Sequence, residues 1–127
     1  MSDSKTALDV LAIFSHPDDA ELSVSGTLLK LKSLGYRTGV LDMTRGEMGT
    51  RGTVAMREQE AADAARILKL DVRLNLGQPD GHIWPTEAAR TEVVRVLRSH
   101  TPKVLLTTHW DDPHPDHANT CHIVREA

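Results

Sequence analysis

The stretch VLAIFSHPDD, residues 10–19, is a short apolar run that ends in a histidine, a proline and two aspartates. Its first five residues have the length and composition of a buried strand. A similar run at residues 104–108 is followed shortly by the motif His114-Pro115-Asp116-His117. In a parallel α/β sheet, ligands bind at the carboxyl ends of the strands. We therefore expect the two polar motifs, far apart in sequence, to converge in one site.

The rest of the chain alternates strand-like and helix-like segments. Strands are expected at residues 10–15, 38–43, 72–76 and 104–108, and helices at residues 20–34, 54–68 and 87–99, with a last helix beginning near residue 117. Gly35 is expected to end the first helix, and Thr86 to be the N-cap of the third. This alternation predicts an α/β fold, a doubly wound parallel sheet with flanking helices, in one domain over residues 1–127.

Apolar residues indicate which helix faces point inward. In the first helix the expected inward positions are leucines, namely Leu22, Leu28, Leu29 and Leu31. In the second helix they are alanines, with charged residues on the opposite face, and the alanines are Ala61, Ala62, Ala64 and Ala65.

Composition excludes several classes of function. The net charge of the 127 residues is −3, with no block of Lys or Arg, and aromatic residues are few, which argues against nucleic-acid binding. The single cysteine, Cys121, cannot form an internal disulfide and suits a reducing cytosol. No segment approaches the roughly 20 apolar residues of a membrane span. We expect a cytoplasmic homo-oligomer that binds neither nucleic acid nor membranes.

The residue types of the two motifs are those of a catalytic zinc site. Two histidines and one carboxylate make a three-ligand site with an open position for water. Asp18 and Asp19 are neighbours, so one can bind the metal while the other accepts a proton from the water. His114 suits an imidazole facing the developing oxyanion, with Asp116 as the carboxylate that orients it. Alternatively, one aspartate is only a helix N-cap and the histidines are surface residues.

Taken together, these motifs resemble the LmbE-like (PIG-L) de-N-acetylase family. The resemblance rests on His16-Pro17-Asp18-Asp19-Ala20-Glu21, on Gly26-Thr27 and on the second motif. Thr44-Arg45-Gly46-Glu47, Leu74-Asn75-Leu76 and Pro79-Asp80 make the chain most similar to the bacillithiol-biosynthesis deacetylases. The resemblance implies a Rossmann-like fold and zinc-dependent removal of acetate from an N-acetylglucosamine derivative. The substrate it implies is N-acetylglucosaminyl-malate.

The resemblance also implies a role for individual residues. The zinc ligands it implies are His16, Asp19 and His117, with ferrous iron as an alternative ion. The catalytic residues it implies are Asp18 as general base, His114 on the oxyanion or leaving-group side, and Asp116 as the partner of His114. It places a substrate-binding arginine at Arg57. Pro113 stands where relatives often carry a bulky or basic residue.

Two features have open interpretations. Asp80 follows the third strand at the same sheet edge, so it either contacts a sugar hydroxyl or only forms a turn. The glycine-rich segment at residues 44–53 is either a lid over the substrate or a flexible connection.

Two other functions remain open. A metal-dependent phosphoesterase is one, although such enzymes often use two metals and more bridging carboxylates. The other is a non-catalytic metal-binding module. We include it because the chain ends soon after its last helix begins, and family members are longer. The chain is therefore expected to be a C-terminally truncated form.

Overall fold

Strands and helices alternate through residues 6–127, the part of the chain that the structure, a computed structural model, describes. The elements are, in order, β1 (Val10–Phe14), α1 (Asp19–Ser33), β2 (Thr38–Thr44), α2 (Val54–Ile67), β3 (Val72–Gln78), α3 (Glu87–His100), β4 (Val104–Thr107) and α4 (Pro115–Glu126). The expected order of elements is confirmed, and the bounds differ by at most two residues.

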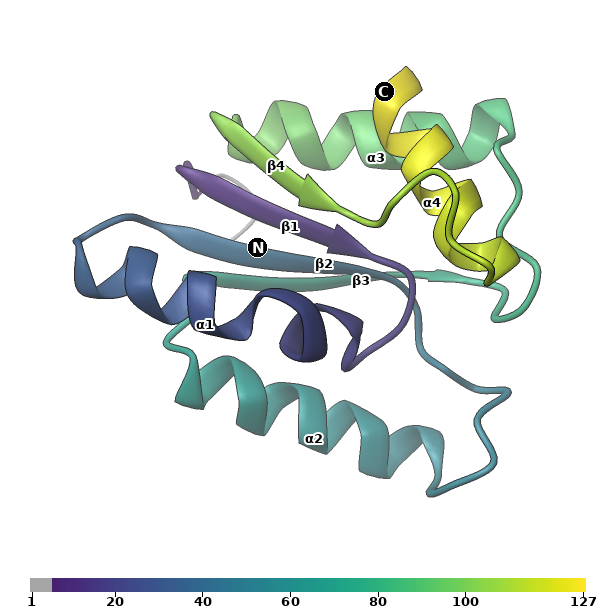
Figure 1. The fold of residues 1–127 in the computed structure, drawn as a ribbon, viewed down its shortest axis with the longest axis horizontal. Coiled ribbons are helices and arrows are strands. Elements are labelled where there is room, and N and C mark those ends of the chain that lie inside the picture. The colour runs from purple at the N-terminus through teal and green to yellow at the C-terminus, as the bar shows by residue number, and fades with distance from the viewer. Residues whose placement is uncertain (1–5) are drawn as a thin grey trace.

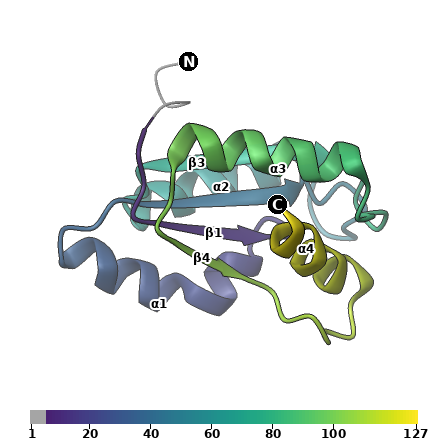
Figure 2. The same ribbon diagram turned by 90° about the horizontal axis from the view of Figure 1, so that it is seen from above.

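The four strands form one parallel sheet in the order β3-β2-β1-β4. Helices α1 and α2 cover one face, and α3 and α4 cover the other (Figures 1 and 2). The chain runs outward from β1 to β3 and then returns to place β4 on the other side of β1. This reversal is a topological switch point, where the carboxyl ends of β1 and β4 leave a crevice between the loops that follow them.

The core has one apolar layer on each face of the sheet. Leu11 and Ile13 of β1 and Leu41 of β2 pack with α3 and α4, which contribute buried Val93 and Ile123. On the opposite face the buried residues are Ala12, Phe14, Ala20, Leu28 and Val40. Because side chains alternate between the two faces of a strand, a strand buried on both sides is apolar throughout. The apolar run of residues 10–14 therefore forms an interior strand of the sheet, buried on both faces.

The apolar face of α1 is narrower than the sequence predicted. Leu28 is fully buried, but Leu22 is 83% exposed and Leu29 is 45% exposed. Leu22 and Leu28 are six positions apart, and with about 3.6 residues per turn they point to different sides of the helix. The assignment of Leu22 and Leu29 as inward residues was wrong.

Helix α2 lies more loosely on the sheet, since none of its residues is buried. Its alanines are too short to fill the space toward β3, and Ala62 is exposed. Thr53 caps the helix by accepting a hydrogen bond from the backbone N–H of Met56 at 3.1 Å. Thr86 caps α3 in the same way, through the N–H of Ala89, as predicted. Among the described residues, no helix is long and apolar enough to cross a membrane.

Candidate active site

The two motifs meet at the switch point. His16 follows β1, Asp19 begins α1, and His117 lies in the first turn of α4. Ser15, fully buried, fixes the two segments to each other: its hydroxyl donates to the backbone oxygen of Asp116 at 3.1 Å and lies 2.8 Å from the Thr120 hydroxyl. The sheet topology therefore brings together residues that lie about a hundred positions apart in the sequence.

Two histidine rings converge on one carboxylate oxygen of Asp19. Asp19 Oδ2 lies 3.0 Å from His16 Nδ1 and 3.1 Å from His117 Nε2. These atoms form one of two groups of potential metal ligands in the described part of the chain. A pair of ring nitrogens and one carboxylate oxygen is a donor set that zinc accepts, with a fourth position left for water.

The far nitrogens of both rings face carboxylates. His16 Nε2 lies 3.0 Å from Asp116 Oδ2 and 3.0 Å from Asp80 Oδ1, and His117 Nδ1 lies 3.2 Å from Asp112 Oδ1. A proton on each far nitrogen leaves the lone pairs of His16 Nδ1 and His117 Nε2 directed toward Asp19. Metal-binding histidines commonly have such carboxylate partners, so the residues present fit a zinc ion.

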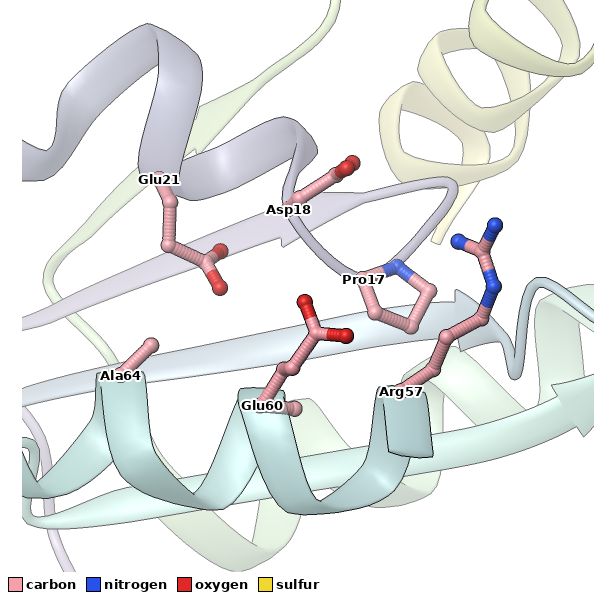
Figure 3. A pocket seen from close by; sticks show the side chains of 7 residues that line it. Pro17, Asp18, Glu21, Arg57, Glu60 and Ala64 are labelled. Atoms are coloured by element: carbon pink, nitrogen blue, oxygen red, sulfur yellow. The ribbon is translucent and has the colours of Figure 1, made fainter. Parts of the chain in front are cut away.

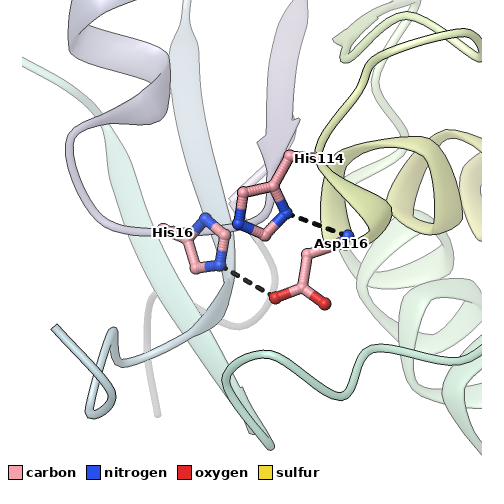
Figure 4. Close-up of side chains that lie close together, drawn as sticks. All are labelled: His16, His114 and Asp116. Atoms are coloured by element: carbon pink, nitrogen blue, oxygen red, sulfur yellow. Dashed lines mark hydrogen bonds and ion pairs between the residues drawn. The ribbon is translucent and has the colours of Figure 1, made fainter.

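The second group of potential ligands is His16, His114 and Asp116. It needs the lone pair of His16 on Nε2, so one neutral imidazole cannot serve both groups. Asp116 is also already engaged, because its carboxylate accepts the backbone N–H groups of Gly81 at 2.8 Å and Ile83 at 3.2 Å. Figure 4 shows the Asp116 carboxylate facing the ring of His16, with their contact dashed. The first group is the better metal site.

The carboxylates around His16 determine its charge when no metal is bound. Burial disfavours the imidazolium, but hydrogen bonds with Asp19 and Asp116 outweigh burial and raise the pKa of His16 to about 9. Burial likewise opposes ionisation of Asp19, yet the hydrogen bond with His16 and the proximity of His117 hold its pKa below the usual value. Binding of a cation there would displace the proton from His16.

Asp18 has a different environment from Asp19. It precedes α1 with φ of 89°, and its side chain makes no capping hydrogen bond, so the simple N-cap interpretation fails. Its side chain instead lines a cavity of about 350 Å³ that also contains His16, Asp19 and His114. Partial burial raises the pKa of Asp18, and the negative charges of Asp19 and Glu21 raise it further. A carboxylate of raised pKa, outside the group of potential metal ligands but beside it, is suited to accept a proton.

His114 is held by the backbone of Asp116, not by its carboxylate. The N–H of Asp116 donates to His114 Nδ1 at 3.1 Å (Figure 4). The expected pairing between the Asp116 carboxylate and the His114 ring is therefore replaced by a contact of that carboxylate with His16. Since Nδ1 accepts a hydrogen bond, the neutral ring carries its proton on Nε2 and can donate it to a ligand in the cavity.

The cavity of about 350 Å³ that contains His16 is called the main cavity below. Arg57 lines both this cavity and a second groove of about 210 Å³ between α1 and α2 (Figure 3). Its Nη2 donates to the backbone oxygen of Arg51 at 2.8 Å. A Cβ at residue 49 would lie only 2.1 Å from that nitrogen, so the close approach requires Gly49. Arg57 thus supports the glycine-rich loop and also faces both cavities.

Asp80 links that loop to the candidate metal site, through His16 Nε2 at 3.0 Å. Its Oδ2 accepts the N–H of Met48 at 2.8 Å, while its own N–H donates to Glu47 Oε2 at 2.9 Å. The hydrogen bond from Asp80 keeps the pKa of Glu47 below its usual value. The segment at residues 44–53 is therefore tied to the site at two points. A contact between Asp80 and a sugar hydroxyl stays a prediction. Both carboxylate oxygens of Asp80 already have a partner, His16 for Oδ1 and Met48 for Oδ2, so the hydroxyl would be an additional one.

Sequence reasoning missed Asp112 and the structural role of Glu47. Asp112 stands two positions before the second motif and Glu47 lies in the glycine-rich segment. Their acidic character is visible in the sequence, but only the fold shows that Asp112 contacts His117 and that Glu47 accepts a hydrogen bond from Asp80.

Comparisons with known proteins agree with this geometry. Residues 11–127 match the family described as PIG-L, GlcNAc-PI de-N-acetylase. The chain is 34% identical to the diacetylchitobiose deacetylase of Thermococcus kodakarensis, over 93% of this chain and 48% of that protein. It is 30% identical to a probable N-acetyl-α-D-glucosaminyl L-malate deacetylase 2 of Bacillus anthracis, over 97% of this chain and 60% of that protein.

A solved structure shows the same fold. The crystal structure of a conserved protein from Thermus thermophilus superposes with a TM-score of 0.90 at 45% identity, covering 93% of this chain and 54% of that one. The chain thus spans about half the length of the relatives it matches.

Proposed function

Since the chain belongs to the PIG-L family of GlcNAc-PI de-N-acetylases, we propose that it is a zinc-dependent hydrolase of the N-acetyl group of an N-acetylglucosamine derivative. The single observation that carries the proposal is the convergence of His16, Asp19 and His117 beside an uncoordinated carboxylate, Asp18. This arrangement separates the residues that bind metal from the residue that moves a proton.

Each proposed ligand contributes one atom to the metal. His16 and His117 offer the ring nitrogens that face Asp19, while their other nitrogens are held by carboxylates. A bound zinc ion supplies Lewis acidity, which polarises an amide carbonyl and lowers the pKa of water to about 7. The same donor set also accepts ferrous iron, which stays the alternative ion.

Asp18 and His114 have complementary roles in the proposed reaction. The Asp18 carboxylate accepts the proton of the attacking water, because it makes no capping bond and its side chain faces the cavity. His114 donates from Nε2 to the developing oxyanion or to the departing amine. The backbone N–H of Asp116 holds the ring in the tautomer that this requires. Asp116 itself acts through His16, as a positioning residue.

The proposed substrate is N-acetylglucosaminyl-malate. Two relatives are named for their substrates, diacetylchitobiose and N-acetyl-α-D-glucosaminyl L-malate, and both substrates contain an N-acetylated sugar. Arg57 favours the second, because its guanidinium faces both cavities and can bind a carboxylate through two hydrogen bonds. Asp80, which lines the same cavity, is proposed to contact a sugar hydroxyl.

A phosphoesterase mechanism has weaker support. Two-metal phosphoesterases hold their ions about 4 Å apart with separate ligands. The two ligand groups of the described chain share His16, so they do not provide two simultaneous sites. A metal-binding module without activity would bind zinc like the proposed enzyme but would not release acetate, so substrate turnover distinguishes the two.

The test combines metal content with substrate turnover. Purified protein is analysed for zinc and assayed for acetate release from N-acetylglucosaminyl-malate, diacetylchitobiose and N-acetylglucosamine, and for phosphate release from p-nitrophenyl phosphate. We expect stoichiometric zinc and acetate release, and both should disappear in His16→Ala. The exposed His82 provides the control His82→Ala, which should keep zinc. Zinc without acetate release from any substrate would favour the metal-binding module.

The same assay tests the role of Arg57. Loss of a hydrogen bond to a charged group costs about 1.5–3 kcal/mol, so Arg57→Ala should weaken turnover of the malate substrate while sparing N-acetylglucosamine. Because Arg57 also supports the loop, an equal loss on both substrates would assign it a structural role.

A further inference from the structure

We propose that Asp112 is a positioning residue that orients both histidines of the second motif, His114 and His117. The proposal rests on the proposed function, since it takes His117 as a metal ligand. Asp112 lies in the loop between β4 and α4, and its side chain is 29% exposed. It belongs neither to the ligand set nor to the residues that line the main cavity.

One oxygen of Asp112 makes both contacts. Oδ1 lies 3.2 Å from His117 Nδ1 and accepts the backbone N–H of His114 at 2.9 Å. The first contact acts on the ring of His117, and the second fixes the backbone from which the ring of His114 extends. Pro113, between them, restricts the backbone further.

The contact with His117 selects one tautomer and one ring orientation. A neutral imidazole has one N–H and one lone pair. When Nδ1–H donates to Asp112, the lone pair stands on Nε2, which lies 3.1 Å from Asp19 Oδ2. A ring without this partner is free to turn or to change tautomer, which directs the lone pair away from the metal position.

The contact with His114 acts on the start of α4. His114 is the N-cap residue of that helix, and its ring accepts the N–H of Asp116. The rings of His114 and His117 are stacked, with centroids 4.6 Å apart and planes inclined by 16°. Asp112 therefore fixes the two rings relative to each other, one through its ring nitrogen and one through its backbone.

The support of the two metal-binding rings is unequal. His16 Nε2 faces two carboxylates, Asp80 and Asp116. Among the described contacts, the far nitrogen of His117 faces Asp112 alone. We therefore expect metal affinity to be more sensitive to loss of Asp112 than to loss of Asp80.

The experiment measures zinc affinity by competition with a chromophoric chelator, for the whole chain. Removal of a carboxylate partner from a metal-binding histidine commonly weakens affinity about 10- to 100-fold, and we expect a loss of this size in Asp112→Ala. Asp112→Asn keeps an oxygen for the His114 N–H but removes the negative charge beside His117, so its loss should be smaller but measurable. The adjacent exposed Asp111 provides the control Asp111→Ala, which should bind zinc like wild type.

A second readout needs neither metal nor activity. Nitrogen-15 NMR of the metal-free protein detects a proton on His117 Nδ1. We expect the contact with Asp112 to protect this proton from exchange with solvent in wild type, and exchange to be faster in both Asp112 variants. If Asp112→Ala does not fold, Asp112→Asn decides. Unchanged zinc affinity and unchanged exchange of this proton in a folded variant would overturn the proposal. Failure of wild type to bind zinc would instead refute the proposed function, and the exchange of this proton would still test Asp112.

Discussion

Asp18 has a backbone conformation that few residues other than glycine adopt, with φ of 89°. Asparagine and aspartate tolerate this region better than most side chains, and such outliers often occur at functional sites. Here the Asp18 carboxylate makes no capping bond to the first turn of α1 and lines the cavity. The neighbouring Asp19 contacts the two histidines instead.

The Asp18→Asn variant should separate metal binding from proton transfer. Asparagine accepts the same backbone conformation but is not a base, so zinc content should stay that of wild type. We expect kcat to fall by at least about two orders of magnitude, the scale of general-base catalysis. Acetate release and zinc content are measured on the same preparation. Activity close to wild type would remove Asp18 from the mechanism.

His114→Ala should affect the transition state more than substrate binding. The Nε2–H bond strengthens only as negative charge develops on the substrate oxygen or as the amine departs, so kcat should fall far more than KM rises. Steady-state kinetics on the acetylated sugar checks this. A change confined to KM would make His114 a residue that binds the ground state.

At the scale of elements, the glycine-rich loop is held in place more firmly than its composition suggests. Glu47 and Met48 are hydrogen-bonded to Asp80, and Arg57 packs against Gly49. Helix α2, which follows the loop, has no buried residue of its own. The wall of the site therefore depends on these polar contacts rather than on an apolar core.

Removing Glu47 should loosen this wall without unfolding the sheet. In Glu47→Ala the N–H of Asp80 loses its acceptor, so hydrogen exchange at the amides of Asp80 and Met48 should become faster. Glu58 is the matched control, because it lies on α2 and, among the described residues, forms an ion pair with the side chain of Arg45 alone, at 4.0 Å. Exchange followed by NMR should be unchanged in Glu58→Ala. Equal protection in Glu47→Ala and wild type would show that the hydrogen bond from Asp80 to Glu47 does not hold the loop.

At the scale of the whole molecule, a buried ionic network connects α1 with the sheet. Arg73 of β3 donates to Asp42 Oδ2 through Nε at 2.9 Å and Nη2 at 2.7 Å, and its Nη1 donates to Glu21 Oε2 at 3.2 Å. Asp42 is 2% exposed, and its Oδ1 is buried without a hydrogen-bond partner. Burial therefore outweighs the attraction of Arg73 and raises the pKa of Asp42 to about 6.

This raised pKa predicts a pH dependence of stability with a definite sign. Between the ordinary value of 3.8 and about 6, the folded chain holds a proton on Asp42 that the unfolded chain has lost. The contribution of Asp42 to the free energy of unfolding should therefore fall as pH rises through this window and stay low above it. Asp42→Asn does not titrate. The stability of wild type relative to this variant should drop by roughly 2–3 kcal/mol across the window.

Denaturant unfolding of the two proteins at a series of pH values measures that difference. A difference that does not change with pH would mean that Arg73 keeps Asp42 ionised throughout.

Much of the fold was predictable because it depends on local patterns. The apolar run at residues 10–14, the cap at Thr86 and the regular alternation of strands and helices predicted the order of elements and a parallel sheet. The burial of individual side chains was less predictable. Leu22 is apolar but exposed, since hydrophobicity alone does not show which side of α1 meets the sheet.

The amino-acid sequence predicts which residues are candidates for the chemistry, because two short motifs of histidine and aspartate, each placed after a strand, are typical of a metal site. Which atom of each residue is available follows from the packing of the folded chain. The Asp116 carboxylate meets His16 instead of His114, Asp112 meets His117, and Asp80 joins the loop to the site. These pairings depend on where β4 and α4 return beside β1. Hydrogen bonds act over about 3 Å, so packing between distant segments selects the partners and residue spacing does not.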